Sequence, residues 1–308
     1  MSATTLVHSI YGYTLYSSDD PFVLGLKEAM ENGTTAALPS NFLVNLFPAL
    51  VHIPEWFPGA KWKRTARKWR EQKDTAVDAA YNWTKNQIAN GSNEPSIVAS
   101  MLNHAAQLGL EPDEVEDYVK QVAVTLFGGG TDTTTSALVM FFMAMMLFPE
   151  VQRKAQKEID TIIGSDRLPT LEDRPKLVYV ERLLTELFRW CPTLPGGFPH
   201  ACYEDDVYKG YGIPRGAMVI ANTWAITRNP KVYPNPEIFD PDRFLNPEVP
   251  PAPAFGFGRR LCPGIHYANA AVFITIASVL ATFDIRLTQD QKGANIVPTM
   301  SENIGRVV

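Results

Sequence analysis

The chain has 308 residues, with 28 Lys and Arg against 33 Asp and Glu, so its formal net charge at pH 7 is −5. Apolar residues make up 45% of the chain and charged residues 20%, a composition that favours a large folded core and argues against disorder. The mild acidity, with no long basic run, argues against a nucleic-acid partner.

The N-terminal third is expected to consist mostly of helices with irregular joints. The first twenty residues lack a basic region followed by a long apolar core, so they predict neither a signal peptide nor a membrane anchor. The clearest joint lies at Pro54–Pro58, where two prolines and two aromatic residues interrupt the periodicity. A long amphipathic helix is predicted after it, over about Lys61–Ala89.

This helix begins with a basic face that lies beside aromatic residues in the sequence. Such a face suits peripheral contact with an anionic membrane surface, although a solvated helix face is the simpler interpretation. The residues concerned are Lys61, Lys63, Arg64, Arg67, Lys68 and Arg70, with the aromatics Trp56, Phe57 and Trp62.

A second long helix is predicted from near Pro112 to Phe148, where Pro149 ends it. Its apolar run, Ala137–Phe148, is shorter than the roughly 20 residues that span a bilayer, so it indicates a buried core helix. Two more helices are expected, one from Pro149 to Gly164 and one over about Leu177–Trp190.

The pattern changes after these helices. Residues 198–222 contain two short β-prone runs around a Gly/Pro turn and predict a small hairpin. Residues 229–255 are proline-rich and loop-like, and a final helix is expected over about Pro263–Phe283. The sequence therefore predicts a mainly α fold with a small β-sheet, in one large domain or two.

The strongest chemical signal is the sequence FGFGRRLCPG, Phe255 to Gly264. Gly256 and Gly258 have no side chains, so the backbone of such a loop can approach a flat ligand closely. The loop brings Cys262, one of only three cysteines, to the start of a helix, where the helix dipole favours a thiolate. Arg260 would be available for an anionic group of the same ligand.

This segment resembles the haem-binding signature of the cytochrome P450 family, Phe-x-x-Gly-x-Arg-x-Cys-x-Gly. The matching positions are Phe255, Gly258, Arg260, Cys262 and Gly264. The resemblance implies a haem b cofactor, with Cys262 as the axial ligand of its iron and Arg260 paired with a haem propionate.

A second segment, FGGGTDTTTS from Phe127 to Ser136, places three glycines inside the long helix. Each costs about 1 kcal/mol relative to alanine, so we expect a loosened groove that admits a small molecule or water. The Lys-Ser/Thr ending of a phosphate-binding loop is absent, and a simple glycine hinge remains an alternative. The segment resembles the oxygen-binding helix motif of the same family, which implies that Asp132 and Thr133 deliver protons.

A third signal is a set of charged residues. Glu186 and Arg189 lie at i and i+3, a spacing that usually makes an exposed pair of little energetic value. The family has Glu-x-x-Arg here and a Pro-x-Arg-Phe motif that matches Arg243, so the resemblance implies a buried three-residue cluster. Loss of one member would leave an uncompensated charge.

His200 follows this helix at a position where the family often has a residue that contacts a haem propionate, although it could equally be a histidine of a surface turn. By the same resemblance, Leu126, Phe127, Thr193, Leu194 and Phe198 would line an apolar substrate pocket. A zinc site made of His200, Cys202, Cys262 and His266 is a weaker alternative, because the paired-ligand spacing of zinc modules is missing.

The resemblance covers essentially all of residues 1–308, as part of one cytochrome P450 domain of a fungal microsomal type. The first strands and an early Trp-x-x-x-Arg helix of the family are not found, so we expect an incomplete cytochrome P450-like fold. The implied function is a haem-dependent monooxygenase of secondary metabolism that uses O2, a small apolar substrate, and electrons from NADPH through NADPH-cytochrome P450 reductase. The implied location is the cytosolic face of the endoplasmic reticulum membrane. The alternative is an inactive, truncated member that binds haem poorly.

Overall fold

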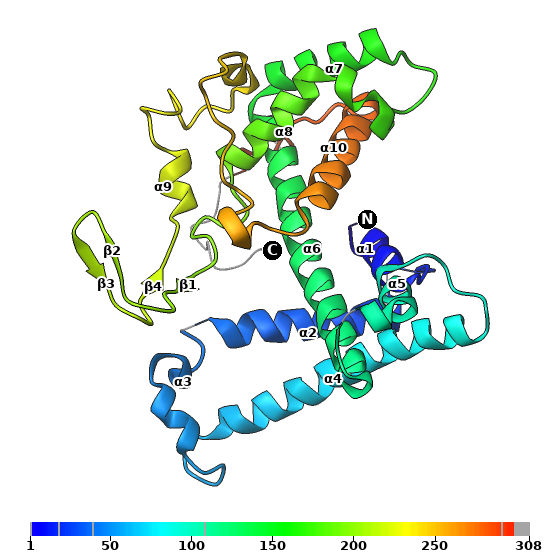
Figure 1. Ribbon diagram of the computed structural model, residues 1–308. Helices are drawn as coiled ribbons and strands as arrows, with labels where there is room; N and C mark the ends of the chain where they lie inside the picture. Colours follow the sequence, from blue (N-terminus) through cyan, green and yellow to red (C-terminus); the bar gives the residue numbers. More distant parts are fainter. Residues whose placement is uncertain (1, 18, 39, 108, 291, 299–308) are drawn as a thin grey trace. The chain divides into compact units, whose positions relative to one another are not determined.

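The computed structural model describes residues 2–17, 19–38, 40–107, 109–290 and 292–298 (Figure 1). The described residues form helices joined by loops, with a few short antiparallel strands, so the predicted mainly α class with little β-structure is confirmed. The chain separates into two compact units, residues 1–131 and 132–308. Helix α6, Pro112–Leu147, runs through the boundary between them.

The first unit is built on helices α2 and α4, which pack along each other in opposite directions (Figure 1). Asp20 caps α2, because its Oδ1 accepts a hydrogen bond from the Phe22 amide at 2.9 Å, and it also accepts one from the Tyr13 hydroxyl at 2.9 Å. The expected long helix begins at Lys61 and ends at Ala89. The elements of this unit before α6 are α1 (Ser2–Tyr11), α2 (Pro21–Ala37), α3 (Leu43–Leu46), η1 (Pro48–His52), α4 (Lys61–Ala89), α5 (Ile97–Asn103) and η2 (Ala105–Gln107).

The three glycines of α6 do not interrupt the helix. A Cβ at Gly130 would lie 3.0 Å from the Leu6 methyl groups of α1, and one at Gly128 would collide with the Met30 sulfur of α2. Two of the three glycines therefore let α1 and α2 approach α6 closely. The sequence had predicted a loosened groove at these glycines and not this packing role.

The second unit has a core of amphipathic helices. The end of α6 contributes buried Phe141, Ala144 and Met145 to this core, and α7, α8 and α10 pack around one another beside it. Its helices are α7 (Pro149–Ile162), η3 (Leu171–Lys176), α8 (Val178–Trp190), α9 (Thr223–Thr227), η4 (Pro241–Leu245), η5 (Gly258–Arg260) and α10 (Ile265–Thr282).

The expected small hairpin is present, and the structure adds a second antiparallel pair whose strands flank it in the sequence. Strands β2 (Asp206–Tyr208) and β3 (Tyr211–Ile213) form the inner pair, joined by Lys209 and Gly210, which both have positive φ. Two positive φ values in succession are typical of the type I′ turn of tight hairpins. The chain then returns so that β4 (Met218–Val219) pairs with β1 (His200–Ala201).

Helix α10 is long and apolar enough to cross a membrane by length and composition, and it is the only single helix of the described residues that meets this test. Helices α6 and α7 meet it only if counted as one span, and they are bent by 105° at their junction. Core packing accounts for part of the apolar character of α10, because Val272, Phe273 and Ile276 are buried among the other helices of the second unit.

Candidate functional site

The glycine-rich segment forms a compact turn just before α10. Gly256 and Gly258 have φ of +86° and +55°, in the left-handed region that favours glycine. The turn closes where the Cys262 amide donates a hydrogen bond to the Phe255 carbonyl at 2.8 Å. Cys262 is half-buried and lies three residues before the first residue of α10, Ile265.

The surroundings of Cys262 combine three kinds of chemistry. The guanidinium of Arg260 is exposed and has no hydrogen-bond or ion-pair partner among the described residues. Phe257 and Leu261 expose 51% and 46% of their surfaces. An accessible sulfur, a cation available for an anion and exposed apolar side chains on one turn fit a haem, which is flat, apolar and carries propionates at one edge.

His200 lies on strand β1, where its backbone pairs with Val219, and its side chain is exposed. It is therefore a strand residue and not part of a turn. The zinc alternative receives no support, because the described residues contain no group of three or more His, Cys, Asp or Glu that could hold a metal ion. Cys202 instead donates from Sγ to the Glu204 carbonyl at 3.0 Å.

Asp132 and Thr133 lie on α6, in the first turn of the second unit. Asp132 is exposed and Thr133 is half-buried, whereas the flanking Thr131 and Thr134 are buried. Of the residues expected to line a pocket, Leu126 and Phe127 belong to the first unit and Thr193, Leu194 and Phe198 to the second.

The structure brings Glu186, Arg189 and Arg243 together in a fully buried cluster. Both Arg189 Nε and Nη2 donate to the Glu186 carboxylate at 2.8 Å, in the bidentate arrangement typical of strong arginine–carboxylate pairs. Arg243 Nε donates to the same carboxylate at 3.0 and 3.1 Å. The backbone amide of Asp240 adds a further hydrogen bond at 2.8 Å.

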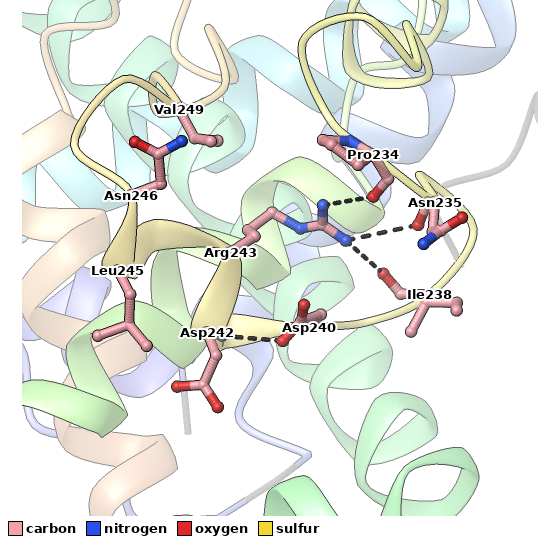
Figure 2. Close-up of a pocket in the computed structure, with 9 residues that line it drawn as sticks. All are labelled: Pro234, Asn235, Ile238, Asp240, Asp242, Arg243, Leu245, Asn246 and Val249. Atoms are coloured by element: carbon pink, nitrogen blue, oxygen red, sulfur yellow. Dashed lines mark hydrogen bonds between the residues drawn. The ribbon is translucent and has the colours of Figure 1, made fainter.

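The remaining N–H groups of the two arginines bind backbone carbonyls of the loop after α9. Arg189 Nη1 donates to the Pro236 carbonyl at 2.7 Å, and both arginines donate to that of Ile238. Arg243 Nη1 donates to the Pro234 carbonyl at 2.8 Å (Figure 2). The cluster thus fixes the irregular loop that leads toward Cys262, since a loop with few regular hydrogen bonds gains its shape from these side chains.

A cavity of about 400 Å³ opens beside this cluster (Figure 2). Its lining combines backbone and side chains of the η4 region: Pro234, Asn235, Ile238, Asp240, Asp242, Arg243, Leu245, Asn246 and Val249. Asp242, next to Arg243 in sequence, binds Lys154 of α7 and lies 3.6 Å from Arg182 of α8. Consecutive residues therefore attach η4 to two different places on the helical core.

Several contacts of the site were not predicted from the sequence. The Phe188 ring of α8 meets the Phe255 ring of the cysteine turn edge-on, with centroids 5.0 Å apart. Trp190 donates from Nε1 to the Glu237 carbonyl at 2.9 Å. The only available signal was their position in and beside the Glu-x-x-Arg motif, which does not specify these partners.

In the first unit, the segment before α4 carries exposed apolar side chains. Trp56 is 81% exposed and Phe47 is 61% exposed. The basic residues nearby are partly engaged, since Lys63 donates to the Val51 carbonyl at 2.7 Å and Arg67 pairs with Glu55. Others on the same helix are exposed: Lys61, Arg64, Lys68 and Arg70.

Comparisons with known proteins agree with this arrangement of motifs. Residues 10–306 match the sequence model of the cytochrome P450 family. Cytochrome P450 monooxygenase 105 of Postia placenta is 39% identical over 311 residues, which cover 99% of this chain and 59% of that protein. Cytochrome P450 monooxygenase claR of Ampulloclitocybe clavipes is 43% identical over 304 residues, which cover 96% of this chain and 56% of that protein.

The chain therefore spans less than three-fifths of the length of these two curated relatives. The match nevertheless extends over nearly the whole of the present sequence and includes all of the motifs described above. The chain belongs to the cytochrome P450 family.

Proposed function

We propose that this chain carries the haem-thiolate centre of a fungal monooxygenase, with residues 1–308 forming part of a single cytochrome P450 domain. The observation that carries the proposal is the half-buried Cys262 on a glycine turn, next to Arg260, whose guanidinium has no partner among the described residues. Bound haem b would supply the iron at which one atom of O2 is inserted into a C–H bond and the other is reduced to water.

The residues of the turn have distinct roles in this proposal. Cys262 would hold the iron through its thiolate, and Gly258 and Gly264 would leave room for the porphyrin beside the backbone. Phe255 would contribute apolar surface to the same cofactor site. Arg260 and His200 pair with the propionates, which suits two exposed side chains that can carry positive charge.

Asp132 and Thr133 would hold and pass the protons that the reaction consumes. Their support is the family motif on α6 and their position outside the buried face formed by Thr131 and Thr134. A proton supply is needed because each turnover consumes O2, one substrate, two electrons and two protons, and releases one hydroxylated product and one water.

The electrons come from NADPH through NADPH-cytochrome P450 reductase, by analogy with the family. The substrate is a small apolar molecule of secondary metabolism, in keeping with half-buried Thr193 and Leu194 and exposed Phe198. The relatives carry the name monooxygenase, and that activity is proposed for the protein that contains this chain.

The test is spectroscopic. The 308-residue chain is purified with added haem, reduced under carbon monoxide and examined for the red-shifted Soret band of thiolate-ligated haem. Cys262→Ser should abolish this band, whereas the control Cys202→Ser should keep it, because Cys202 binds only the Glu204 carbonyl. A band that survives Cys262→Ser would overturn the proposal. Absence of the band in the 308-residue chain alone would favour the truncated, inactive alternative. Its absence also in a version of the length of the relatives would refute the monooxygenase proposal.

A second test concerns the proton pathway. Thr133→Ala should retain the thiolate band but divert electrons from NADPH to peroxide. Thr135→Ala is the control: Thr135 is exposed and lies two residues after Thr133 on α6, and the substitution should leave coupling unchanged. Equal coupling of electrons to product in both variants would remove Thr133 from the mechanism.

We also propose that the first unit makes a peripheral contact with the cytosolic face of the endoplasmic reticulum membrane. The support is the exposed apolar segment before α4 beside an exposed basic helix face, a combination that favours binding to anionic interfaces. The exposed apolar residues are Leu43, Leu46, Phe47, Val51, Trp56 and Phe57.

Sedimentation with lipid vesicles tests this contact. The chain should bind phosphatidylserine-containing vesicles more strongly than pure phosphatidylcholine, and Trp56→Ser should weaken binding. Tyr211→Ser removes an equally exposed aromatic residue of the second unit and should have no effect. Equal binding of wild type and Trp56→Ser would contradict the proposal.

A further inference from the structure

The cysteine turn is built almost entirely from hydrogen bonds within itself. The amides of Gly256, Arg260, Leu261 and Cys262 donate to carbonyls of Pro253, Phe257, Gly258 and Phe255, respectively, at 2.8–3.3 Å. Its C-terminal end continues into α10, because the Ile265 amide donates to the Cys262 carbonyl at 3.3 Å and the Ala268 amide donates to the Gly264 carbonyl at 2.8 Å. Among the described residues, no backbone hydrogen bond attaches its first residues, around Phe255, to a helix of the core, so this end depends on side-chain contacts.

One attachment is the edge-on contact between Phe188 and Phe255. Phe188 lies on α8 between Glu186 and Arg189, whose side chains are fully buried. Its own side chain is half-buried, like that of Phe255, so the pair lies at the margin of the core and not in its centre. An edge-to-face pair at this centroid distance is favourable beyond the apolar area that it buries.

The contact leads directly to the sulfur ligand. The backbone of Phe255 accepts the hydrogen bond of the Cys262 amide, so the residue that receives the Phe188 ring also sets the position of Cys262. We propose that Phe188 is a positioning residue for Cys262: it anchors the cysteine turn to the rigid helix α8 through the Phe255 ring. Its consequence for haem ligation rests on the function proposed above, whereas the anchoring itself does not.

Hydrogen exchange measured by mass spectrometry tests the anchoring on the full chain without haem. The peptide that covers residues 255–264 reports opening of the turn through the amides named above. Phe188→Ala should speed exchange in this peptide roughly three- to tenfold, the change expected for loss of one aromatic pair. Phe188→Tyr retains the ring and should exchange like the wild type.

A matched control separates anchoring from a general loss of stability. Phe148 is also partly buried in the second unit and contacts Trp190 and Phe239 edge-on or tilted, but no ring of the cysteine turn. Phe148→Ala should leave exchange of residues 255–264 unchanged at temperatures where the chain is folded. Phe188→Leu, which keeps apolar volume, covers the case in which Phe188→Ala fails to fold, and it should show a smaller increase.

Unchanged exchange in the foldable Phe188 variants, or an equal increase in Phe148→Ala, would overturn the inference. The double variant Phe188→Ala/Phe255→Ala should exchange no faster than the faster single variant, because both remove the same contact. With haem added, Phe188→Ala should also show a smaller fraction of thiolate-ligated iron than the wild type. Absence of the thiolate band in the wild type would count against the proposed function and would leave the exchange result standing.

Discussion

Glu186 is the residue whose removal the structure predicts to be most damaging. Its carboxylate lies between two guanidinium groups, and the side chains of Glu186 and Arg189 are completely buried, with that of Arg243 only 4% exposed. Glu186→Gln keeps the shape but removes the charge, and it turns an amide N–H₂ toward arginine donors. Two buried cations then share one amide oxygen and the backbone carbonyls as acceptors, with no negative charge between them.

Breaking a buried pair in this way costs about 3–5 kcal/mol, so we expect the free energy of unfolding to fall by about that amount. The measurement is urea unfolding followed by tryptophan fluorescence and circular dichroism. Glu181→Gln is the control, because Glu181 also binds an arginine of the second unit bidentately but is 42% exposed. A loss of less than about 1 kcal/mol is expected there. If Glu186→Gln were no more destabilising than Glu181→Gln, the reasoning about the buried cluster would be refuted.

Three further predictions concern other parts of the chain. The buried Tyr11 hydroxyl has no hydrogen-bond partner among the described residues, and burial raises its pKa. Tyr11→Phe should therefore raise the free energy of unfolding by about 1 kcal/mol, whereas Tyr13→Phe, which loses the hydrogen bond to Asp20, should lower it. Calorimetry that ranks the two variants in the opposite order would contradict this. Hydrogen bonds from Arg167 and from the Thr170 backbone hold the pKa of Asp173 well below its usual range. The ionised carboxylate therefore stabilises the fold at neutral pH, and this stabilisation is lost as the pH falls below the ordinary carboxyl range. The difference in melting temperature between wild type and Asp173→Asn should shrink on acidification, and a constant difference would contradict this prediction. Gly129→Ala meets no atom within 4 Å and should stabilise α6 by up to about 1 kcal/mol, while Gly128→Ala must displace Met30 and should gain less, as melting temperatures will show.

Helix positions followed from local signals in the sequence. Pro149 begins α7 and Gly164, with φ of +78°, follows its end, as the breaker residues predicted. The cap at the start of α8 could not be predicted from local sequence signals, because the capping side chain comes from another helix. The Glu158 carboxylate of α7 accepts hydrogen bonds from the Tyr179 and Val180 amides at 2.8–3.0 Å.

The strands were harder to predict, since runs of two or three residues carry almost no alternation. The sequence predicted a hairpin around a Gly/Pro turn within residues 198–222 but did not locate the turn at Lys209 and Gly210, and the pairing of His200 with Val219 depends on the return path of the chain. In the candidate site, motif spacing named the charged residues and Cys262. It gave no information on Phe188, because an aromatic contact depends on where a distant loop packs.

The buried charge cluster also links two segments that are far apart in the sequence. Glu186 of α8 and Arg243 of η4 are joined by buried hydrogen bonds, so the sequence between them forms a loop that these bonds close. The inner hairpin, with exposed residues throughout Asp206–Tyr208, lies within this loop. A single cut between Lys209 and Gly210 should therefore leave both pieces held together.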